Sequence, residues 1–387
     1  MKKFIYADNA ATTKLSDRAL DAMMPYLRDH YGNPSSIYSA GREAHRAVED
    51  ARRKIAAAIH APAGDIYFTS CGTESDNWAL KGTARRLKKE GKNHIITTVI
   101  EHHAILHAAK SLEEDGFDVT YLPVDTKGRV SAEAVREAIR PQTALVSVMY
   151  ANNEIGTVQP VAEIGEICRR EGILFHTDAV QAAGILPIDV KEQKIDMLSM
   201  SAHKFNGPKG TGVLYCRKGF CPDNLLDGGA QERGHRSGTE NVAYIAGMAA
   251  ALEEACLTME EKAARLASLR DRIQEGILAI PGTYLNGDEE NRLPGILNVS
   301  FEKIDGEALL FELDMKGIAA SSGSACTSGS VDPSHVLLAA GVPYQLAHGS
   351  LRISLGRYNT EEEADQIVKG VTEAVEDLRA GRVSRNG

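Results

Sequence analysis

Two short apolar runs, Gly172-Ile-Leu-Phe-His-Thr-Asp178 and Met197-Leu-Ser-Met-Ser-Ala-His-Lys204, carry the strongest indication of the fold. Each run has the length and apolar content that are typical of a buried strand, and each ends on a charged residue. The segment between them is long enough for a crossover connection, so the two strands are expected to run parallel in one sheet. Asp178 and Lys204 would then lie on neighbouring strand ends.

The same alternation of short apolar runs with longer amphipathic segments continues on both sides of these two runs. Further strands are predicted at 65–69, 93–98, 118–122, 144–149 and 212–216, and helices at 41–60, 75–90, 131–139, 161–171 and 259–279. Strands separated by roughly 20 to 30 residues with a helix between them need crossover connections, which give a mostly parallel sheet covered by helices on both faces. The predicted fold class is therefore α/β.

The pattern of predicted elements changes after the predicted helix at 259–279. Short segments at 297–301, 307–316, 317–321 and 351–354 precede a terminal helix at 361–380, a pattern that is typical of a smaller α+β domain. A chain of 387 residues exceeds what one compact core usually organises, so two domains are expected. We predict a large domain over 15–255 and a small domain made of 1–14 together with 256–387.

The composition excludes several classes of protein. A formal net charge of −9 argues against a broad nucleic-acid-binding face, which needs clustered Lys and Arg. The N-terminal residues lack the apolar segment of a signal peptide, and no stretch approaches the roughly 20 apolar residues that span a bilayer. The six cysteines are scattered without a CxxC pair, which predicts reduced thiols and no structural zinc. We expect a cytoplasmic protein with no direct nucleic-acid or membrane partner.

Asp178 and Lys204 together form the pair that a pyridoxal cofactor requires. Such a cofactor needs an amine for the Schiff base and a carboxylate that keeps the pyridine nitrogen protonated, so that the ring acts as an electron sink. Taken alone, Asp178 would be interpreted as a capping or turn residue. Lys204 stands between an apolar strand and the Gly-rich segment 206–212, a poor position for a surface charge. The pair predicts pyridoxal 5′-phosphate, bound beyond the carboxyl ends of the strands.

A site for the phosphate group is predicted at Ser70-Cys-Gly-Thr-Glu-Ser75, directly before the helix expected at 75–90. The free N–H groups and the dipole at a helix N-terminus favour an anion. Gly72 permits close approach and Thr73 adds a hydroxyl group. The alternative is an ordinary helix N-cap. Two further candidate donors flank the lysine: Ser201 and His203.

Cys326 lies in Ser321-Ser-Gly-Ser-Ala-Cys-Thr-Ser-Gly-Ser330, a run of small polar residues that cannot form a packed core. Cys168 and Cys216, by contrast, lie in apolar runs that are typical of buried cysteines. We therefore expect an exposed thiol on a mobile loop at Cys326. A nucleophilic role would need a nearby general base or cationic group, because an unperturbed thiol is mostly protonated near pH 7.

Arg352 interrupts the apolar strand Leu351-Arg-Ile-Ser-Leu355, where a charge is costly unless it is paired. Two kinds of partner fit the pattern equally. One is the α-carboxylate of a substrate, held by two parallel hydrogen bonds, and the other is an internal salt bridge.

Several motifs occur together with this lysine and this aspartate. They are Tyr6-Ala-Asp-Asn-Ala-Ala-Thr-Thr13, Gly32-Asn-Pro-Ser-Ser36, Asn152-Asn-Glu-Ile-Gly156, Arg233-Gly-His-Arg-Ser-Gly-Thr239 and the Cys326 loop. In this combination the chain resembles the class V aminotransferase-like cysteine desulfurases, the group close to NifS and IscS, over almost its whole length. Each motif is weak alone, but the set is specific. The resemblance implies a homodimer with the fold type I of pyridoxal-phosphate-dependent transferases.

The resemblance also implies a role for each matching residue. Lys204 would be the Schiff-base lysine, Asp178 the partner of the pyridine nitrogen, and His102 the residue stacked on the ring. Gln181 would contact the phenolic oxygen, and Asn153 would lie near cofactor and substrate. The residues expected to hold the phosphate are Gly72, Thr73, Ser201 and His203, with Thr239 arriving from the partner subunit.

The implied reaction converts L-cysteine to L-alanine. Lys204 would move protons at the α-carbon, with His102 beside it, and Cys326 would attack the substrate sulfur, while Arg352 and Asn153 bind the substrate. The resulting persulfide on Cys326 would pass to acceptor proteins such as iron–sulfur scaffolds, for cluster assembly or for thio-cofactor and tRNA modification. Because the Cys326 loop must reach the cofactor and then present sulfur outward, we expect it to be poorly ordered without substrate.

Three positions depart from the family pattern. Tyr38 stands where a histidine is expected, Cys71 where serine is commoner, and His235 where methionine is usual. None of them falls on the lysine, the aspartate or the reactive cysteine. They bear on acceptor preference and fine tuning rather than on the reaction.

Other interpretations fit less of the chain. Ser201-Ala-His-Lys204 matches the S-x-x-K pattern of serine acyl enzymes, but the partner motifs are missing. His103 and His107 have a zinc-binding spacing without the H-E-x-x-H glutamate, so no metal is expected. A protein that only binds and delivers a partner would have no use for the strand-end pair. A selenocysteine lyase and a cysteine sulfinate desulfinase stay open, because they use similar scaffolds.

Overall fold

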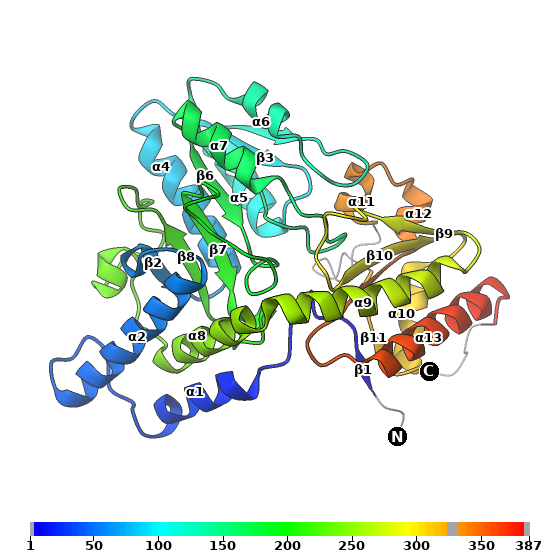
Figure 1. Cartoon of the computed structure of the whole chain (residues 1–387). Helices are drawn as coiled ribbons and strands as arrows, with labels where there is room; N and C mark the ends of the chain where they lie inside the picture. Colours follow the sequence, from blue (N-terminus) through cyan, green and yellow to red (C-terminus); the bar gives the residue numbers. More distant parts are fainter. Residues whose placement is uncertain (1–3, 323–331, 383–387) are drawn as a thin grey trace.

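The structure is a computed structural model that describes residues 4–322 and 332–382, so Cys326 and most of its loop lie outside the described residues. Within the described part, the largest sheet has seven strands in the order β2-β8-β7-β6-β5-β3-β4 (Figure 1). Their bounds are β2 Ile66–Thr69, β3 His94–Thr98, β4 Asp118–Leu122, β5 Thr143–Ser147, β6 Leu174–Asp178, β7 Met197–Ser201 and β8 Gly212–Cys216.

The direction of the strands determines where their ends meet. β4, β3, β5, β6 and β7 pair in parallel, whereas β8 runs antiparallel to both of its neighbours. The register pairs Asp178 with Ser199, and Ser201 with Gly212. The carboxyl ends of β6 and β7 therefore share one edge of the sheet with the amino end of β8. The predicted mostly parallel sheet and the α/β fold class are confirmed.

Helices cover both faces of this sheet because alternate residues of each strand are apolar on both sides. In β5, Val146 belongs to one apolar cluster and Leu145 to another, and Met200 and Met197 of β7 divide in the same way. The first cluster includes α2 (Ser39–Ala58), α6 (Ala132–Ala138), α7 (Val161–Glu171) and α8 (Val242–Leu257). The second includes the π-helical turn η2 (Trp78–Gly82), α4 (Thr83–Lys88) and α5 (His103–Glu114). Such two-sided burial explains why the strands have nearly continuous apolar sequences.

A separate apolar core lies beside the large sheet (Figure 1). It contains an antiparallel sheet in the order β12-β10-β9 and a parallel pair of β1 with β11. The bounds are β1 Ile5–Tyr6, β9 Thr283–Asn286, β10 Ile296–Phe301, β11 Ile318–Ala319, β12 Ser350–Ser354, α9 Met259–Leu278, α10 Gly306–Met315 and α13 Glu361–Arg379. Ile5 packs in this core with side chains from the C-terminal third of the chain. The boundaries proposed for the two domains, 15–255 against 1–14 with 256–387, stay a prediction.

Several helices were not predicted, and for two of them, α8 and α1 (Asp17–Arg28), the structure gives a physical reason. α8 has buried residues on all its sides, so its sequence lacks an amphipathic period. α1 contains Pro25, a residue that argues against a helix when only the sequence is considered. The side chain of Ser16 caps α1 by accepting a hydrogen bond from the N–H of Ala19. Tertiary packing, with α1 lying along α8, stabilises both helices.

No single helix in the described ranges is long and apolar enough to cross a membrane. α8 and α9 reach the required length and hydropathy only when they are taken together, and they are bent by 73° at their junction. The apolar side chains of α8 are buried in the large core.

A buried ion pair fastens α2 to the segment that follows β8. Arg52 donates from Nη1 and Nη2 to the two carboxylate oxygens of Glu232, each over 2.8 Å, and Nη1 also donates to the carbonyl of Ile66 over 2.8 Å. Glu232 in turn accepts from the N–H of Phe68 over 2.9 Å. The side chains of Arg52 and Glu232 are only 4% and 2% exposed, so neither charge has access to water.

We expect Arg52→Leu to lower the free energy of unfolding by about 3 to 5 kcal/mol, because it leaves the Glu232 carboxylate buried without its partner. Chemical denaturation followed by circular dichroism measures the change. Arg53→Leu is the matched control, since Arg53 is 62% exposed and pairs with an exposed Asp50, and it should cost no more than about 1 kcal/mol. Equal losses in the two variants would contradict the prediction.

Candidate active site

A cavity of about 280 Å³ opens at the edge where β6, β7 and the amino end of β8 meet. It collects most of the residues that the sequence singled out, although they come from distant parts of the chain. Its lining residues are Ala10, Ala11, Cys71, Gly72, Thr73, Asp76, His102, Met149, Ala151, Asn153, Asp178, Val180, Gln181, Ser201, His203, Lys204 and Arg352. Thr239 is exposed in the segment before α8 and does not line the cavity of its own chain, so its role in a partner subunit stays a prediction.

Lys204 lies in a 3₁₀ turn, Ala202–Lys204, directly after β7. Its ammonium group donates to the carbonyl of Ala10 and, over 2.9 Å, to the carbonyl of Ala11. These contacts join the amine to the N-terminal segment, which was expected to belong to the small domain. They also hold the nitrogen at the wall of the cavity, where a bound aldehyde could reach it.

Asp178 ends β6 and accepts a hydrogen bond from the N–H of Val180 over 2.9 Å. Burial raises its pKa to about 6, against the opposing effects of this hydrogen bond and of the Lys204 charge. Asp76 lies close by, is fully buried, and has one carboxylate oxygen without a hydrogen-bond partner among the described residues. Burial and the charge of Asp178 hold the pKa of Asp76 well above its usual range. Of the two acids, Asp178 is therefore the one that ionises, and a cation in the cavity would favour its ionised form.

The sequence prediction missed Asp76. In Ser75-Asp-Asn-Trp78 its neighbours are a mixture of polar and apolar residues, and this mixture does not indicate that the acid is buried. Only the packing of α3 (Gly72–Asn77) against the sheet buries this carboxyl group and aims it at the cavity.

His102 caps α5, and its Nδ1 accepts a hydrogen bond from the N–H of Ala104 over 3.1 Å. Burial lowers the pKa of His102 to about 4, with smaller contributions from Lys204 and from nearby histidines. The imidazole is therefore neutral near pH 7. Because Nδ1 acts as an acceptor, the proton of this neutral ring is on Nε2.

The expected phosphate cradle lies at the start of α3. The helix begins at Gly72, not at residue 75 as predicted, and it continues through η2 into α4. The N–H groups of its first turn have no carbonyl partner within the helix, so they are free to bind an anion. A Cβ atom on Gly72 would lie 2.8 Å from Cγ2 of Val180, so no larger residue fits without a shift.

Two side chains from the end of β7 complete this part of the cavity. Ser201 ends the strand, and His203 lies one residue before the lysine, with its Nδ1 3.1 Å from the hydroxyl of Thr12. Burial lowers the pKa of His203 to about 4, so this imidazole is also neutral at pH 7.

The position of Arg352 is compatible with both of its predicted partners, an internal salt bridge and a substrate carboxylate. Arg352 is 2% exposed in β12, donates from Nη2 to Asp8 over 2.8 Å, and donates from Nη1 to the carbonyl of Asn153 over 3.0 Å. The internal salt bridge is thus present. Its Nε nevertheless has no hydrogen-bond partner among the described residues, although the side chain lines the cavity. Gln181 also lines the cavity and donates to the carbonyl of Ala10 over 3.0 Å.

The three departures from the family pattern lie in different places. Cys71 lines the cavity as the residue before α3, whereas Tyr38 is 57% exposed at the start of α2. His235 stands edge-on to Tyr67, with their ring centroids 5.6 Å apart, and does not line the cavity.

His103 and His107 lie together with His335, with ring centroids 5.0 Å apart for the first pair and 4.9 Å apart for His103 and His335. His335 contacts the carbonyl of Glu101 through Nε2 over 3.1 Å. Over residues 4–322 and 332–382, no group of three or more His, Cys, Asp or Glu side chains is arranged to hold a metal ion.

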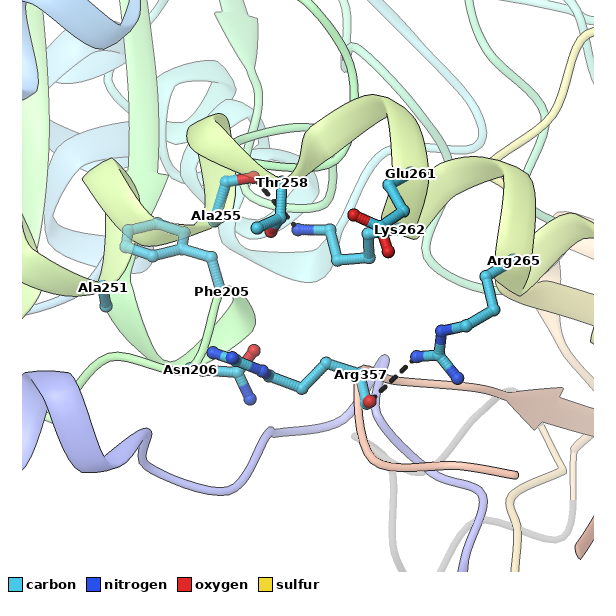
Figure 2. Close-up of a pocket in the computed structure, with 9 residues that line it drawn as sticks. All are labelled: Phe205, Asn206, Ala251, Ala255, Thr258, Glu261, Lys262, Arg265 and Arg357. Carbon is cyan, nitrogen blue, oxygen red and sulfur yellow. Dashed lines mark hydrogen bonds between the residues drawn. The ribbon is translucent and has the colours of Figure 1, made fainter.

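A second cavity of about 160 Å³ lies where α8 meets α9 (Figure 2). Its cations contact protein groups: Lys262 donates to the carbonyls of Gly184 and Ala255, Arg265 donates to the carbonyl of Arg357, and Arg357 pairs with Glu254. Figure 2 shows the Lys262 side chain turned towards the carbonyl of Ala255 and the Arg265 side chain turned towards that of Arg357. None of the predicted site residues lines this cavity.

We expect His102 in the cofactor-free protein to titrate near pH 4, because burial disfavours its charged form. The measurement is a proton–carbon NMR titration of histidine-labelled protein, with the His102 signal assigned by its loss in His102→Gln. In Lys204→Ala the pKa should rise, since one nearby positive charge is removed, but burial should keep it below 6.5. A midpoint near 6.5 in the unaltered protein would refute the buried, neutral imidazole.

Comparison with known proteins identifies the family of this chain. The class V aminotransferase family matches residues 5–367. The cysteine desulfurase IscS of Methanosarcina thermophila is 55% identical over 377 residues, which cover 97% of this chain and 93% of that protein. A solved NifS-like protein superposes with a TM-score of 0.91 at 42% identity, covering 97% of this chain and all of that one. SspA, solved in complex with cysteine, is 38% identical with a TM-score of 0.81, over 92% of this chain and all of that one. The chain belongs to the class V aminotransferase family, within the group of its cysteine desulfurases.

Proposed function

We propose that this chain is a pyridoxal 5′-phosphate enzyme that converts L-cysteine to L-alanine and leaves a persulfide on Cys326. The observation that carries the proposal is the meeting of Lys204 and Asp178 in one cavity with His102 and the start of α3. The similarity to desulfurases over nearly the whole chain supports the same reaction. We further propose a homodimer in the cytoplasm that delivers sulfur to an acceptor protein, such as an iron–sulfur scaffold, without contacting nucleic acid directly.

The residues present fit this cofactor on three counts. Gly72 lines the cavity without a side chain, at a helix start suited to a phosphate group. A cation beside Asp178 would favour the ionised form of its carboxyl group, and a protonated pyridine nitrogen would be such a cation. Lys204 offers an amine at the wall of the same cavity. We propose that the remaining contacts come from Thr73, His102, Asn153, Gln181, Ser201 and His203, with Thr239 supplied by the partner subunit.

When bound, the cofactor supplies an electron sink that stabilises negative charge at the substrate α-carbon. The residues of the chain then have distinct tasks. Lys204 would carry a proton to and from that carbon, and the neutral His102, whose proton is on Nε2, would help to hold the ring of the cofactor. The carboxylate of the substrate is bound by Arg352, whose Nε is buried and unpaired among the described residues.

Cys326 completes the reaction by attacking the sulfur of the substrate. A bond forms between the two sulfur atoms, the bond between Cβ and sulfur of the substrate breaks, and the electron pair goes to the carbon that becomes the methyl group of alanine after protonation. The thiolate is the reactive form, so the reaction should slow below the pKa of this thiol.

The proposal predicts two separable losses. Lys204→Ala should abolish both the visible absorption of the bound cofactor and alanine formation, whereas Cys326→Ala should keep the absorption and lose desulfuration. The assay follows sulfide and alanine after L-cysteine and a reductant are added. Lys209→Ala is the control for the lysine, because Lys209 is exposed nearby, and Cys256→Ser is the control for the cysteine. Protein that stays colourless with added cofactor, or a Cys326→Ala variant as fast as the unaltered protein, would contradict the proposal. Activity on selenocysteine but not on cysteine would favour a selenocysteine lyase.

We expect Arg352→Gln to raise the KM for L-cysteine roughly 10- to 100-fold, the range for losing a hydrogen bond to a charged group, with a smaller fall in kcat. Steady-state kinetics measures both constants. Asp8→Asn is the matched control because it breaks the same salt bridge but keeps the guanidinium. If Asp8→Asn raises KM as much as Arg352→Gln does, Arg352 acts through the salt bridge and not on the substrate.

A further inference from the structure

Two cysteines, Cys216 and Cys221, flank a tight turn at the end of β8. β8 ends at Cys216, and the turn closes with a hydrogen bond of 3.2 Å from the N–H of Phe220 to the carbonyl of Arg217. Gly219, in the middle of the turn, has a φ of 101°, which allows the sharp reversal. The chain therefore reverses its direction between Cys216 and Cys221, and the two thiols are hydrogen-bonded to each other.

This placement suits a disulfide bond. β2 and β7 pair with the two edges of β8, so the chain after the turn forms no hairpin with β8, but Cys221 packs against the same apolar cluster that contains Cys216. Disulfides need Cα separations of about 4.4 to 6.8 Å, and a single tight turn between two residues can bring their Cα atoms into this range. Both thiols are free in this structure.

The surroundings give the two sulfur atoms different reactivities. Cys216 is 2% exposed, and burial raises the pKa of its thiol well above the usual range. Cys221 is half-buried, and its pKa is lowered, first by the hydrogen bond with Cys216 and then by Tyr67 and the charges of Arg86 and Arg233, against the effect of burial. Cys221 is thus the accessible nucleophile, and Cys216 is the thiol behind it.

The two arginines are held in place by aromatic rings. The guanidinium of Arg86 lies 5.1 Å from the ring centroid of Phe220 and donates to the carbonyl of Cys221 over 2.6 Å. Arg233 lies 4.1 Å from the ring centroid of Tyr67 and donates to the carbonyl of Ile66 over 2.7 Å. A half-buried thiol between fixed cations is the environment in which cysteines become reactive.

We propose that Cys216 and Cys221 form a reversible intramolecular disulfide and are a redox site distinct from Cys326. The register pairs Cys216 with Met197, at the end of β7 opposite to Lys204, so the site lies away from the cavity. It therefore does not depend on the proposed desulfurase reaction.

The reaction balances with a hydroperoxide as the oxidant. The Cys221 thiolate attacks one peroxide oxygen, so that an S–O bond forms, the O–O bond breaks, and the leaving oxygen takes up a proton to give water or an alcohol. The Cys216 thiol then attacks the oxidised sulfur of Cys221, forming the S–S bond and releasing water. Two thiols lose two electrons in total and the peroxide gains them.

The test uses the full-length protein with the change Cys326→Ser, so that the catalytic thiol does not interfere. It is treated with hydrogen peroxide, its remaining thiols are alkylated, and it is digested with trypsin without reduction. Because Arg217 and Lys218 lie between the two cysteines, trypsin separates them, and a disulfide appears in the mass spectrum as one cross-linked peptide pair. We expect this pair to form, and to disappear when a reductant is added.

Variants assign the roles of the two sulfur atoms. Cys221→Ser should abolish the cross-link, Cys216→Ser should leave a sulfenic acid on Cys221 that dimedone traps, and Cys256→Ser, at another half-buried thiol, should change nothing. Arg86→Gln keeps both thiols and guards against misfolding of the serine variants, and it should slow cross-linking about threefold or more. Alkylation of both cysteines after peroxide treatment, with no cross-linked pair, would overturn the proposal, as would an Arg86→Gln rate equal to that of the parent protein.

Discussion

The parallel pairing of β6 with β7 is the constraint on which the candidate active site depends. It brings the ends of both strands, with Asp178 and Lys204, to one edge of the sheet. The antiparallel β8 then starts at that edge, with Gly212 opposite Ser201. A Cβ atom on Gly212 would lie 2.7 Å from the backbone of Cys71, so glycine lets the segment before α3 cross close to the sheet. The position of the cavity is thus a property of strand direction and register.

Burial at this edge moves several titratable groups towards their neutral forms. It raises the pKa of Glu101 to about 8 and that of Asp178 to about 6, and it lowers the pKa of His102 and His203 to about 4. Charges that enter such a site interact strongly, because little water screens them. This environment suits a cofactor that carries a phosphate and a protonated ring nitrogen, because the start of α3 can bind the phosphate and Asp178 can pair with the ring nitrogen.

The two ends of β8 lie beside two different candidate sites. Its amino end, at Gly212, borders the cavity, whereas its carboxyl end, at Cys216, meets Cys221. At about 3.3 Å per residue the two ends are about 13 Å apart. A strand that runs against its neighbours therefore separates the reactive thiol pair from Lys204 while keeping both within one rigid sheet.

The sequence by itself determined the fold class, the limits of α7, and the strand-end positions of Asp178 and Lys204, because periodicity and apolar runs report burial within a few residues. Motifs then identified the family. Only the tertiary structure decided the contacts between distant segments. Arg352 meets Asp8 across 344 residues, and Arg52 meets Glu232 across 180. Even the contact of Cys216 with Cys221 depends on how the turn packs. Such pairs follow from the packing of whole elements, a property that no local window of the chain contains.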